Sequence, residues 1–348
     1  MKLSQIKSGD QLSTRSILTW RVIQTLVWLI GAFILYSLIF KPTLGIHLFW
    51  NILIPVAPLL FVVSVGVWRN VCPMASTALF FRHIGLSKRK KLTIPQSGKL
   101  KLIAIIALFI IIPLRHAIFN LSGQATAILI IALGVVAITV SFFNEWKSAW
   151  CSGLCPVHPV ENLYGLRNKI KLPNAHCNQC HKCVTPCPDS TPKNNPLSTT
   201  KTAYHRITGI LTVGAFPGFV WGWFQVPDYN GITSLSELIS IYQPPFIGML
   251  VSSFIFLVLK KVLNKKTITE LFAIAAVSFY YWFRIPALFG FGIYPENGML
   301  IDLTKTIPEW TIQVIVRVLV LFFFIWLYVS KQNNNSWAIR PRYADIEK

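Results

Sequence analysis

Four cysteines between residues 177 and 188 have a spacing that predicts metal chemistry. Cys177, Cys180, Cys183 and Cys187 lie in the stretch CNQCHKCVTPCP, a C-x2-C-x2-C-x3-C-P run. Ferredoxin-type loops bind [4Fe–4S] clusters with this spacing. Zinc is the alternative, but zinc sites usually combine two C-x2-C pairs across a longer spacer. The run therefore predicts one [4Fe–4S] cluster held by these four thiolates.

Three further cysteines, Cys72, Cys151 and Cys155, suggest a second site. Cys72 and Cys155 each precede a proline, as Cys187 does. Because proline is tolerated at the first position of a helix, each thiol is expected at or near an N-cap, where the helix dipole favours the thiolate. Cys151 and Cys155 also repeat the x3 spacing of the run's second half, which favours a redox or metal role. A buried, inert thiol is the alternative, above all for Cys72.

The cysteine count limits the number of clusters. The chain has seven cysteines, whereas two all-cysteine [4Fe–4S] clusters would need eight. We therefore expect one cluster, and keep Cys72, Cys151 and Cys155 as a candidate second metal site that would need a non-cysteine ligand. Nearby histidines could supply it or could be ordinary loop residues: His158, His176 and His181.

The composition indicates a membrane protein. Apolar residues make up 53% of the chain and charged residues 13%, and the mean hydropathy is +0.55. About eight apolar runs are long enough to cross ~30 Å of hydrocarbon. We predict an all-α polytopic membrane protein with a small ferredoxin-like [4Fe–4S] loop on its cytoplasmic face. The predicted spans are residues 20–40, 46–67, 101–120, 124–144, 206–226, 244–263, 267–288 and 310–330.

The positive charge is distributed as in a membrane protein rather than a nucleic-acid-binding one. The formal net charge is +21, but the basic residues lie on alternate loops between the apolar runs. The positive-inside rule then places both termini in the cytoplasm, in a multi-pass protein of the cell (inner) membrane surrounded by membrane lipid. All seven cysteines fall on the cytoplasmic side, which argues against a disulfide framework.

The first half of the chain contains an internal repeat. Two spans lead to the sequence WRNVCP and a basic stretch, and two more lead to CSGLCP and another basic stretch. The paired Cys-Pro sequences favour a duplicated unit over a coincidence of basic loops. We therefore divide the chain into a cytoplasmic N-terminal tail, a four-span unit, a ferredoxin-type loop, a second four-span unit and a cytoplasmic C-terminal tail: residues 1–19, 20–172, 173–200, 201–330 and 331–348.

Residues 20–190 resemble a group of membrane-bound ferredoxin-type proteins, the NapH and NosR group. The resemblance rests on spans that end in CxxxCP beside a CxxCxxCxxxCP loop. The chain is also similar to the cytochrome oxidase accessory group that includes CcoG. The resemblance implies electron supply to a reductase, with the second CxxxCP at Cys151 and Cys155. The first CxxxCP is incomplete, because Trp68 replaces its first cysteine and only Cys72 remains.

These features predict a membrane-bound iron–sulfur electron-transfer protein. It would pass electrons between the quinone pool or a cytoplasmic donor and a partner oxidoreductase, as a subunit of a respiratory complex rather than a stand-alone enzyme. The alternatives are a copper reductase or assembly factor that uses Cys151 and Cys155, and a transporter or sensor with a structural cluster.

Because all cysteines are expected on one face, electrons bound for the far side would need a quinone, a haem or a partner subunit. The candidates near that side are His47, His116, Arg284 and Arg317, since an ionisable group within a span usually faces a cavity or a partner. The two arginines could instead pair with Glu296, Asp302 or Glu309.

Overall fold

The fold of the protein is known from a computed structural model. It describes residues 8–9, 13–166, 170, 172–173, 175–176, 195–198, 202–232, 234–294, 298–330 and 338–341. Cys177, Cys180, Cys183, Cys187, His181 and Glu296 lie outside these ranges, and so do the interactions predicted for them.

Seven helical stretches of the described chain are long and apolar enough to cross a membrane. Each has at least 21 residues, which at 1.5 Å per residue spans about 30 Å or more. The polytopic architecture is thereby confirmed. The stretches are α1 (Thr14–Phe40), Pro42–Ala78, Ile94–His116, α7 (Gly123–Phe143), α11 (Leu235–Leu259), α12 (Lys265–Leu288) and Glu309–Val329.

The predicted span at 206–226 is helical but is not among the seven. It consists of α9 (Ala203–Ile210), the π-helical η6 (Leu211–Ala215) and α10 (Phe216–Trp223). Residues 212–220 are all buried. Glycines and tryptophans lower the hydropathy of this stretch, and helix packing rather than lipid covers it. Among the described residues, seven helices are thus long and apolar enough to cross a membrane, against eight predicted from the sequence, and the crossing at 206–226 stays a prediction.

Several spans are composite helices. The second contains α2 (Pro42–Ile46), η2 (His47–Leu53), α3 (Ile54–Val71) and α4 (Pro73–Ala78), with a kink at Ser64. The third joins α6 (Ile94–Ile111) to the 3-10 turn η3 (Pro113–His116), and the last joins α13 (Glu309–Phe324) to η7 (Ile325–Val329). The shorter elements are α5 (Phe80–His83), η4 (Lys147–Leu154) and α8 (His158–Tyr164).

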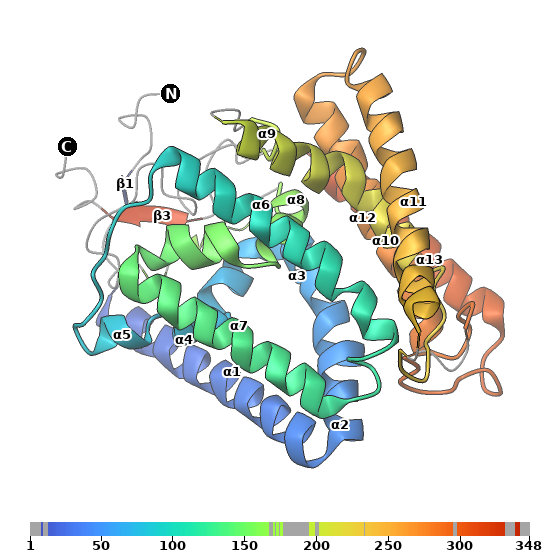
Figure 1. Cartoon of the computed structure of the whole chain (residues 1–348), viewed down its shortest axis with the longest axis horizontal. Helices are drawn as coiled ribbons and strands as arrows, with labels where there is room; N and C mark the ends of the chain where they lie inside the picture. Colours follow the sequence, from blue (N-terminus) through green and yellow to red (C-terminus); the bar gives the residue numbers. More distant parts are fainter. Residues whose placement is uncertain are drawn as a thin grey trace.

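The helices of the two predicted four-span units form two groups that pack side by side. Figure 1 shows α1, α3, α6 and α7 in one group and α10, α11, α12 and α13 in the other. One large apolar cluster joins the groups, with Phe61 and Ile105 from the first and Phe216 and Phe256 from the second. The core of the molecule thus lies between the two groups.

Helices α10 and α11 cross at two glycines. A Cβ atom at Gly218 would overlap the backbone of Gly248, and one at Gly248 would overlap the backbone of Gly218. The backbones therefore touch directly, which is the close packing that small residues permit between membrane helices.

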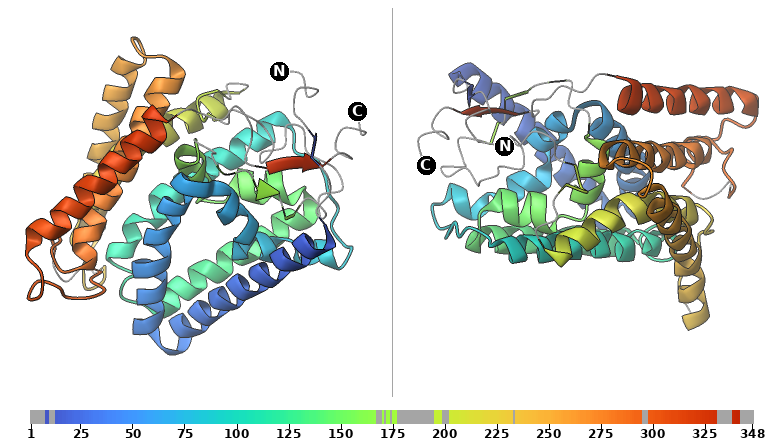
Figure 2. Two further views of the ribbon diagram at one scale, coloured as in Figure 1. Left: turned by 180° about the vertical axis from the view of Figure 1, so that it is seen from behind. Right: turned by 90° about the horizontal axis from the view of Figure 1, so that it is seen from above.

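Three short strands complete the described structure. They are β1 (Ser8–Gly9), β2 (Leu172–Pro173) and β3 (Ala338–Pro341), in the order β1-β3-β2 with both pairs parallel. This small sheet is absent from the all-α prediction. It joins segments near both ends of the chain to the segment that precedes the cysteine run (Figures 1 and 2).

Candidate functional site

The three cysteines outside the run lie together at one end of the helices, which we call the thiol end. Cys72 and Cys151 pack against one cluster formed by Ala75, Leu79 and Trp146. Cys151 and Cys155 pack against a neighbouring cluster that contains Trp150. The three thiols are half-buried and form no disulfide. The structure thus brings together residues that are up to 83 positions apart in the sequence (155 − 72).

Local backbone geometry places Cys72 and Cys155 at equivalent positions. Each has an extended ψ, 118° and 120° respectively, and each precedes a proline. Cys72 is the N-cap of α4, as predicted, whereas Cys155 lies three residues before the first residue of α8. Two backbone N–H groups approach each sulfur, those of Met74 and Ala75 at Cys72 and those of the corresponding residues after Pro156 at Cys155.

Burial nevertheless keeps Cys155 in its thiol form. Removal from water, with a smaller contribution from the nearby Cys72, outweighs the opposing effect of the Val157 and His158 N–H groups and raises the pKa of Cys155 to about 12. The backbone N–H groups thus favour the thiolate as predicted, but burial outweighs them at Cys155, so the thiol is its favoured form. A metal that binds here would have to displace the proton, because the thiolate is the metal-binding form.

Two buried ion pairs connect the repeated units at the thiol end. Arg69, which precedes Cys72, pairs with Glu161, which follows Cys155. Arg82 Nη1 and Nη2 donate to the two carboxylate oxygens of Glu145 at 3.0 and 3.3 Å. No more than 9% of any of these four side chains is exposed. In both pairs the first unit supplies the arginine and the second supplies the glutamate.

His158 extends the first of these pairs. Its Nδ1 lies 3.5 Å from Arg69 Nη2 and 3.8 Å from Glu161 Oε2. Burial raises the pKa of Glu161, but the Arg69 charge and His158 outweigh it, so that the pKa is lowered overall. Burial lowers the pKa of His158. At neutral pH the cluster therefore contains one guanidinium, one carboxylate and a neutral imidazole.

The two residues that precede the cysteine run, Ala175 and His176, lie next to the thiol cluster. His176, the residue before Cys177, is 1% exposed, and its ring lies 5.2 Å from the ring of Trp146, edge to face. The backbone N–H of Ala175 donates to Asn70 Oδ1 at 3.0 Å. Ala175 and His176 are thus anchored to residues that surround Cys72 and Cys151.

No preformed metal site is found in the part of the chain that the structure describes. No three of its His, Cys, Asp and Glu side chains are grouped so that they could hold a metal ion. Cys72, Cys151 and Cys155 share a packing cluster without forming such a group. Their role as a second metal site stays a prediction, as does the ligand role of His158 and His176.

Buried arginines lie at the opposite end of the helices, which we call the arginine end. Arg284 is 2% exposed, and its Nη2 donates to Asn51 Oδ1 at 2.7 Å and to the Trp50 carbonyl at 3.0 Å. Arg115 is 3% exposed and donates to the same Asn51 oxygen at 3.4 Å. The Arg115 guanidinium also lies 5.6 Å from the ring of Trp50 and 5.5 Å from that of Trp223.

The other residues predicted for this side have different surroundings. Arg317 is exposed on α13 and does not join Arg284. Asp302 accepts from Thr304 and Glu309 from Gln313, so neither is the predicted partner of Arg284. His47 contacts Asn51 at 2.9 Å, and His116 contacts Asp228 at 2.6 Å.

Sequence reasoning missed the two ion pairs, although a signal was present. Glu145 and Glu161 are the only acidic residues between Asp10 and Asp189. Isolated carboxylates in such a basic, apolar region are expected to be paired. The identity of the partners depends on the tertiary fold, because Arg69 and Glu161 are 92 residues apart.

Comparison of the chain with protein-family models, with curated proteins and with solved structures gives no match. The functional argument therefore rests on the residues themselves.

Proposed function

We propose that the protein is a membrane-bound iron–sulfur electron-transfer protein. Cys177, Cys180, Cys183 and Cys187 hold a [4Fe–4S] cluster, which supplies one-electron acceptance and release when bound. The observation that supports this proposal best is the anchoring of the run's first neighbour, His176, against Trp146 in the cluster that also contains Cys72 and Cys151. The residue that precedes the run therefore lies at the same end of the helices as the other three cysteines, which supports a cysteine-rich redox site there.

The dimensions of the fold favour a second electron carrier. Helix α3 has 18 residues between the arginine end and Cys72, a rise of about 27 Å. This distance is too great for a single tunnelling step. Electrons that leave the thiol end for the other side would travel on a quinone or through a partner respiratory subunit, and electrons used on the same side would come from a cytoplasmic donor.

Metal analysis of anaerobically purified protein tests the proposal. We expect about four irons and four acid-labile sulfides per chain, a band near 400 nm that dithionite bleaches, and a paramagnetic signal in the reduced state. Cys180→Ser should remove this iron, whereas Cys72→Ser, which alters a cysteine outside the run, should retain it. Zinc in place of iron, or equal iron in the wild type and Cys180→Ser, would refute the proposal. About eight irons would indicate a second cluster.

A copper reductase or assembly factor is the second candidate, favoured by the packing of Cys72, Cys151 and Cys155 in adjoining clusters. Thiolates are soft ligands that suit Cu(I). Copper binding that is lost in a Cys151→Ser, Cys155→Ser variant with intact iron content would favour this function. Copper binding equal to that of the wild type would exclude it.

A further inference from the structure

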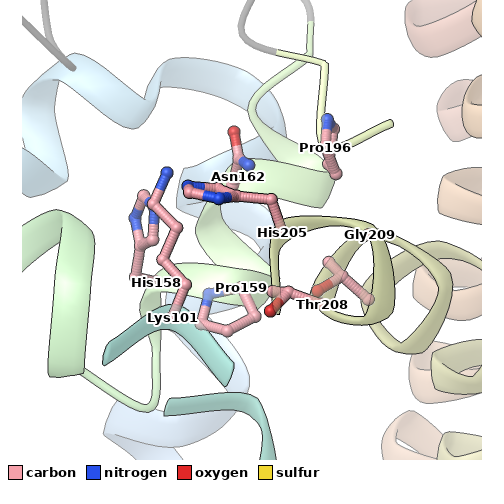
Figure 3. Close-up of a pocket in the computed structure, with 9 residues that line it drawn as sticks. Lys101, His158, Pro159, Asn162, Pro196, His205, Thr208 and Gly209 are labelled. Atoms are coloured by element: carbon pink, nitrogen blue, oxygen red, sulfur yellow. The ribbon is translucent and has the colours of Figure 1, made fainter. Parts of the chain in front are cut away.

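A small pocket lies beside the thiol end, between α6, α8, α9 and η6. Its volume is about 30 Å³, room for about two water-sized groups. Figure 3 shows Lys101, His158, Asn162 and His205 around it, with their nitrogen-bearing ends on the same side of the pocket. The side chains that could contact a ligand thus come from three helices that are distant in the sequence.

The pocket is positively charged. None of the described residues that line it carries a carboxylate. Within the described residues, the Lys101 ammonium has neither an ion pair nor a hydrogen bond. Glu161 lies one helical turn after His158, but its carboxylate is engaged by Arg69. A half-buried ammonium without a counter-ion is costly, so the pocket favours an anion.

The polar groups around Lys101 are held in position by neighbours outside the pocket. His158 Nδ1 faces Arg69 at 3.5 Å, and His205 Nδ1 lies 2.9 Å from Thr202 Oγ1. Gly98 brings α6 close to α9, because a Cβ atom there would lie 2.8 Å from His205 Nδ1. Fixed donors around one cation are suited to an oxyanion, which accepts several charge-assisted hydrogen bonds at once.

The position of the pocket indicates which oxyanion is available. Lys101 lies seven residues after the start of α6 at Ile94, roughly 10 Å along the helix. Basic pockets between membrane helices at such depths bind the headgroups of anionic lipids. We propose that the Lys101 pocket binds a phosphate group, supplied either by an anionic lipid headgroup or by free phosphate. This proposal does not depend on the iron–sulfur function.

Ligand-dependent thermal unfolding of the full chain in detergent tests the proposal. The probes are phosphatidylglycerol, with zwitterionic phosphatidylcholine, whose phosphate charge is balanced by its choline, as the net-neutral comparison, and inorganic phosphate, with chloride at equal ionic strength. We expect a saturable rise in the Tm of the wild type. Lys101→Gln should need at least about tenfold more ligand, the loss expected for one charge-assisted hydrogen bond.

Lys99→Gln is the matched control. Lys99 is exposed on the same helix, lies 5.6 Å over the ring of Tyr204 and does not line the pocket. This variant should respond as the wild type does. If Lys101→Gln does not fold, His205→Gln is tested in its place, and it should also need about tenfold more ligand than the wild type.

The outcomes are distinct. A response to phosphatidylglycerol alone identifies a lipid headgroup, and a response to inorganic phosphate identifies a free-anion site. The proposal is overturned if neither probe raises the Tm, or if the pocket variant needs no more ligand than the wild type. It is also overturned if Lys99→Gln needs as much additional ligand as the pocket variant.

Discussion

The two ends of the helical bundle hold buried arginines in different ways. At the thiol end, Arg69 and Arg82 each face a glutamate from the other repeated unit. At the arginine end, Arg115 and Arg284 share the neutral oxygen of Asn51, and Arg284 also binds a backbone carbonyl. The indole rings of Trp50 and Trp223 face the Arg115 guanidinium.

The two arrangements predict different losses of stability when one arginine is removed. Where a guanidinium and a carboxylate are buried together, removal of one leaves the other unpaired, and the cost is large. Where a guanidinium is held by neutral acceptors and aromatic faces, its removal leaves neutral groups behind. The thiol end should therefore tolerate single changes less well than the arginine end.

The largest expected effect is loss of one partner of the Arg69–Glu161 pair. Arg69→Met should lower the free energy of unfolding by about 3–5 kcal/mol, because it leaves the Glu161 carboxylate buried and unpaired. The double variant Arg69→Met, Glu161→Leu should recover much of this loss. Reversible unfolding in mixed micelles measures both. If the double variant were no more stable than Arg69→Met, the loss could not be attributed to the unpaired Glu161 carboxylate.

Loss of Arg284 should cost less. Arg284→Met should lower the free energy of unfolding by about 1–3 kcal/mol, the penalty for unsatisfied neutral acceptors, partly offset because repulsion from Arg115 disappears. Arg317→Met, which changes an exposed arginine on α13, should lie within about 0.5 kcal/mol of the wild type. If Arg284→Met lowered the free energy of unfolding as much as Arg69→Met does, the predicted difference in tolerance between the two ends would be wrong.

A glycine at the arginine end gives a smaller effect. Gly298 has φ +70°, and an added Cβ would lie 2.6 Å from Arg115 Nη2 and 2.7 Å from Arg284 Nη1. Gly298→Ala should cost about 1–2 kcal/mol for the left-handed backbone alone. Gly134→Ala in α7 is the control, because its Cβ would meet no atom within 4 Å. Thermal unfolding should show the control to be neutral or slightly stabilised.

The smallest predicted effect is the pH dependence that His158 and Glu161 give to the thiol end. The pKa of His158 is lowered in the folded state, so the unfolded chain binds a proton first as the pH falls below about 6.5. Stability should decrease there, and decrease again below about 4.5, as Glu161, whose pKa is also lowered, becomes protonated. His158→Gln should flatten the first decrease in Tm. An unchanged profile between pH 7 and 5.5 would contradict this assignment.

Much of the helical framework is predictable because hydropathy is a local property. The errors arise where tertiary contacts override local signals. Pro244 and Pro245 suggest a span that begins at 244, yet α11 begins at Leu235 behind a capping box formed by Ser234 and Glu237. The stretch at 206–226 has the pattern of a span, yet other helices bury residues 212–220, which a hydropathy pattern does not predict.

The grouping of the three cysteines outside the run was predictable, but the arrangement of the residues around them was not. The Cys-Pro sequences indicated that Cys72, Cys151 and Cys155 belong together, and the structure places them in adjoining clusters. The pairing of arginine with glutamate between units was not predictable, nor was the burial of Arg115, because both depend on which helices pack together. The raised pKa of Cys155 depends on the same packing.

The sheet of β1, β3 and β2 has a practical consequence for biochemical work. It places segments close to both chain ends beside the strand at Leu172–Pro173, four residues before Cys177. A histidine tag fused to either end would be tethered to this sheet, and its imidazoles could compete for metal with the cysteines that follow Pro173 in the sequence. The turn at Gly231, where a Cβ would meet no atom within 4 Å, offers an insertion point at the arginine end instead.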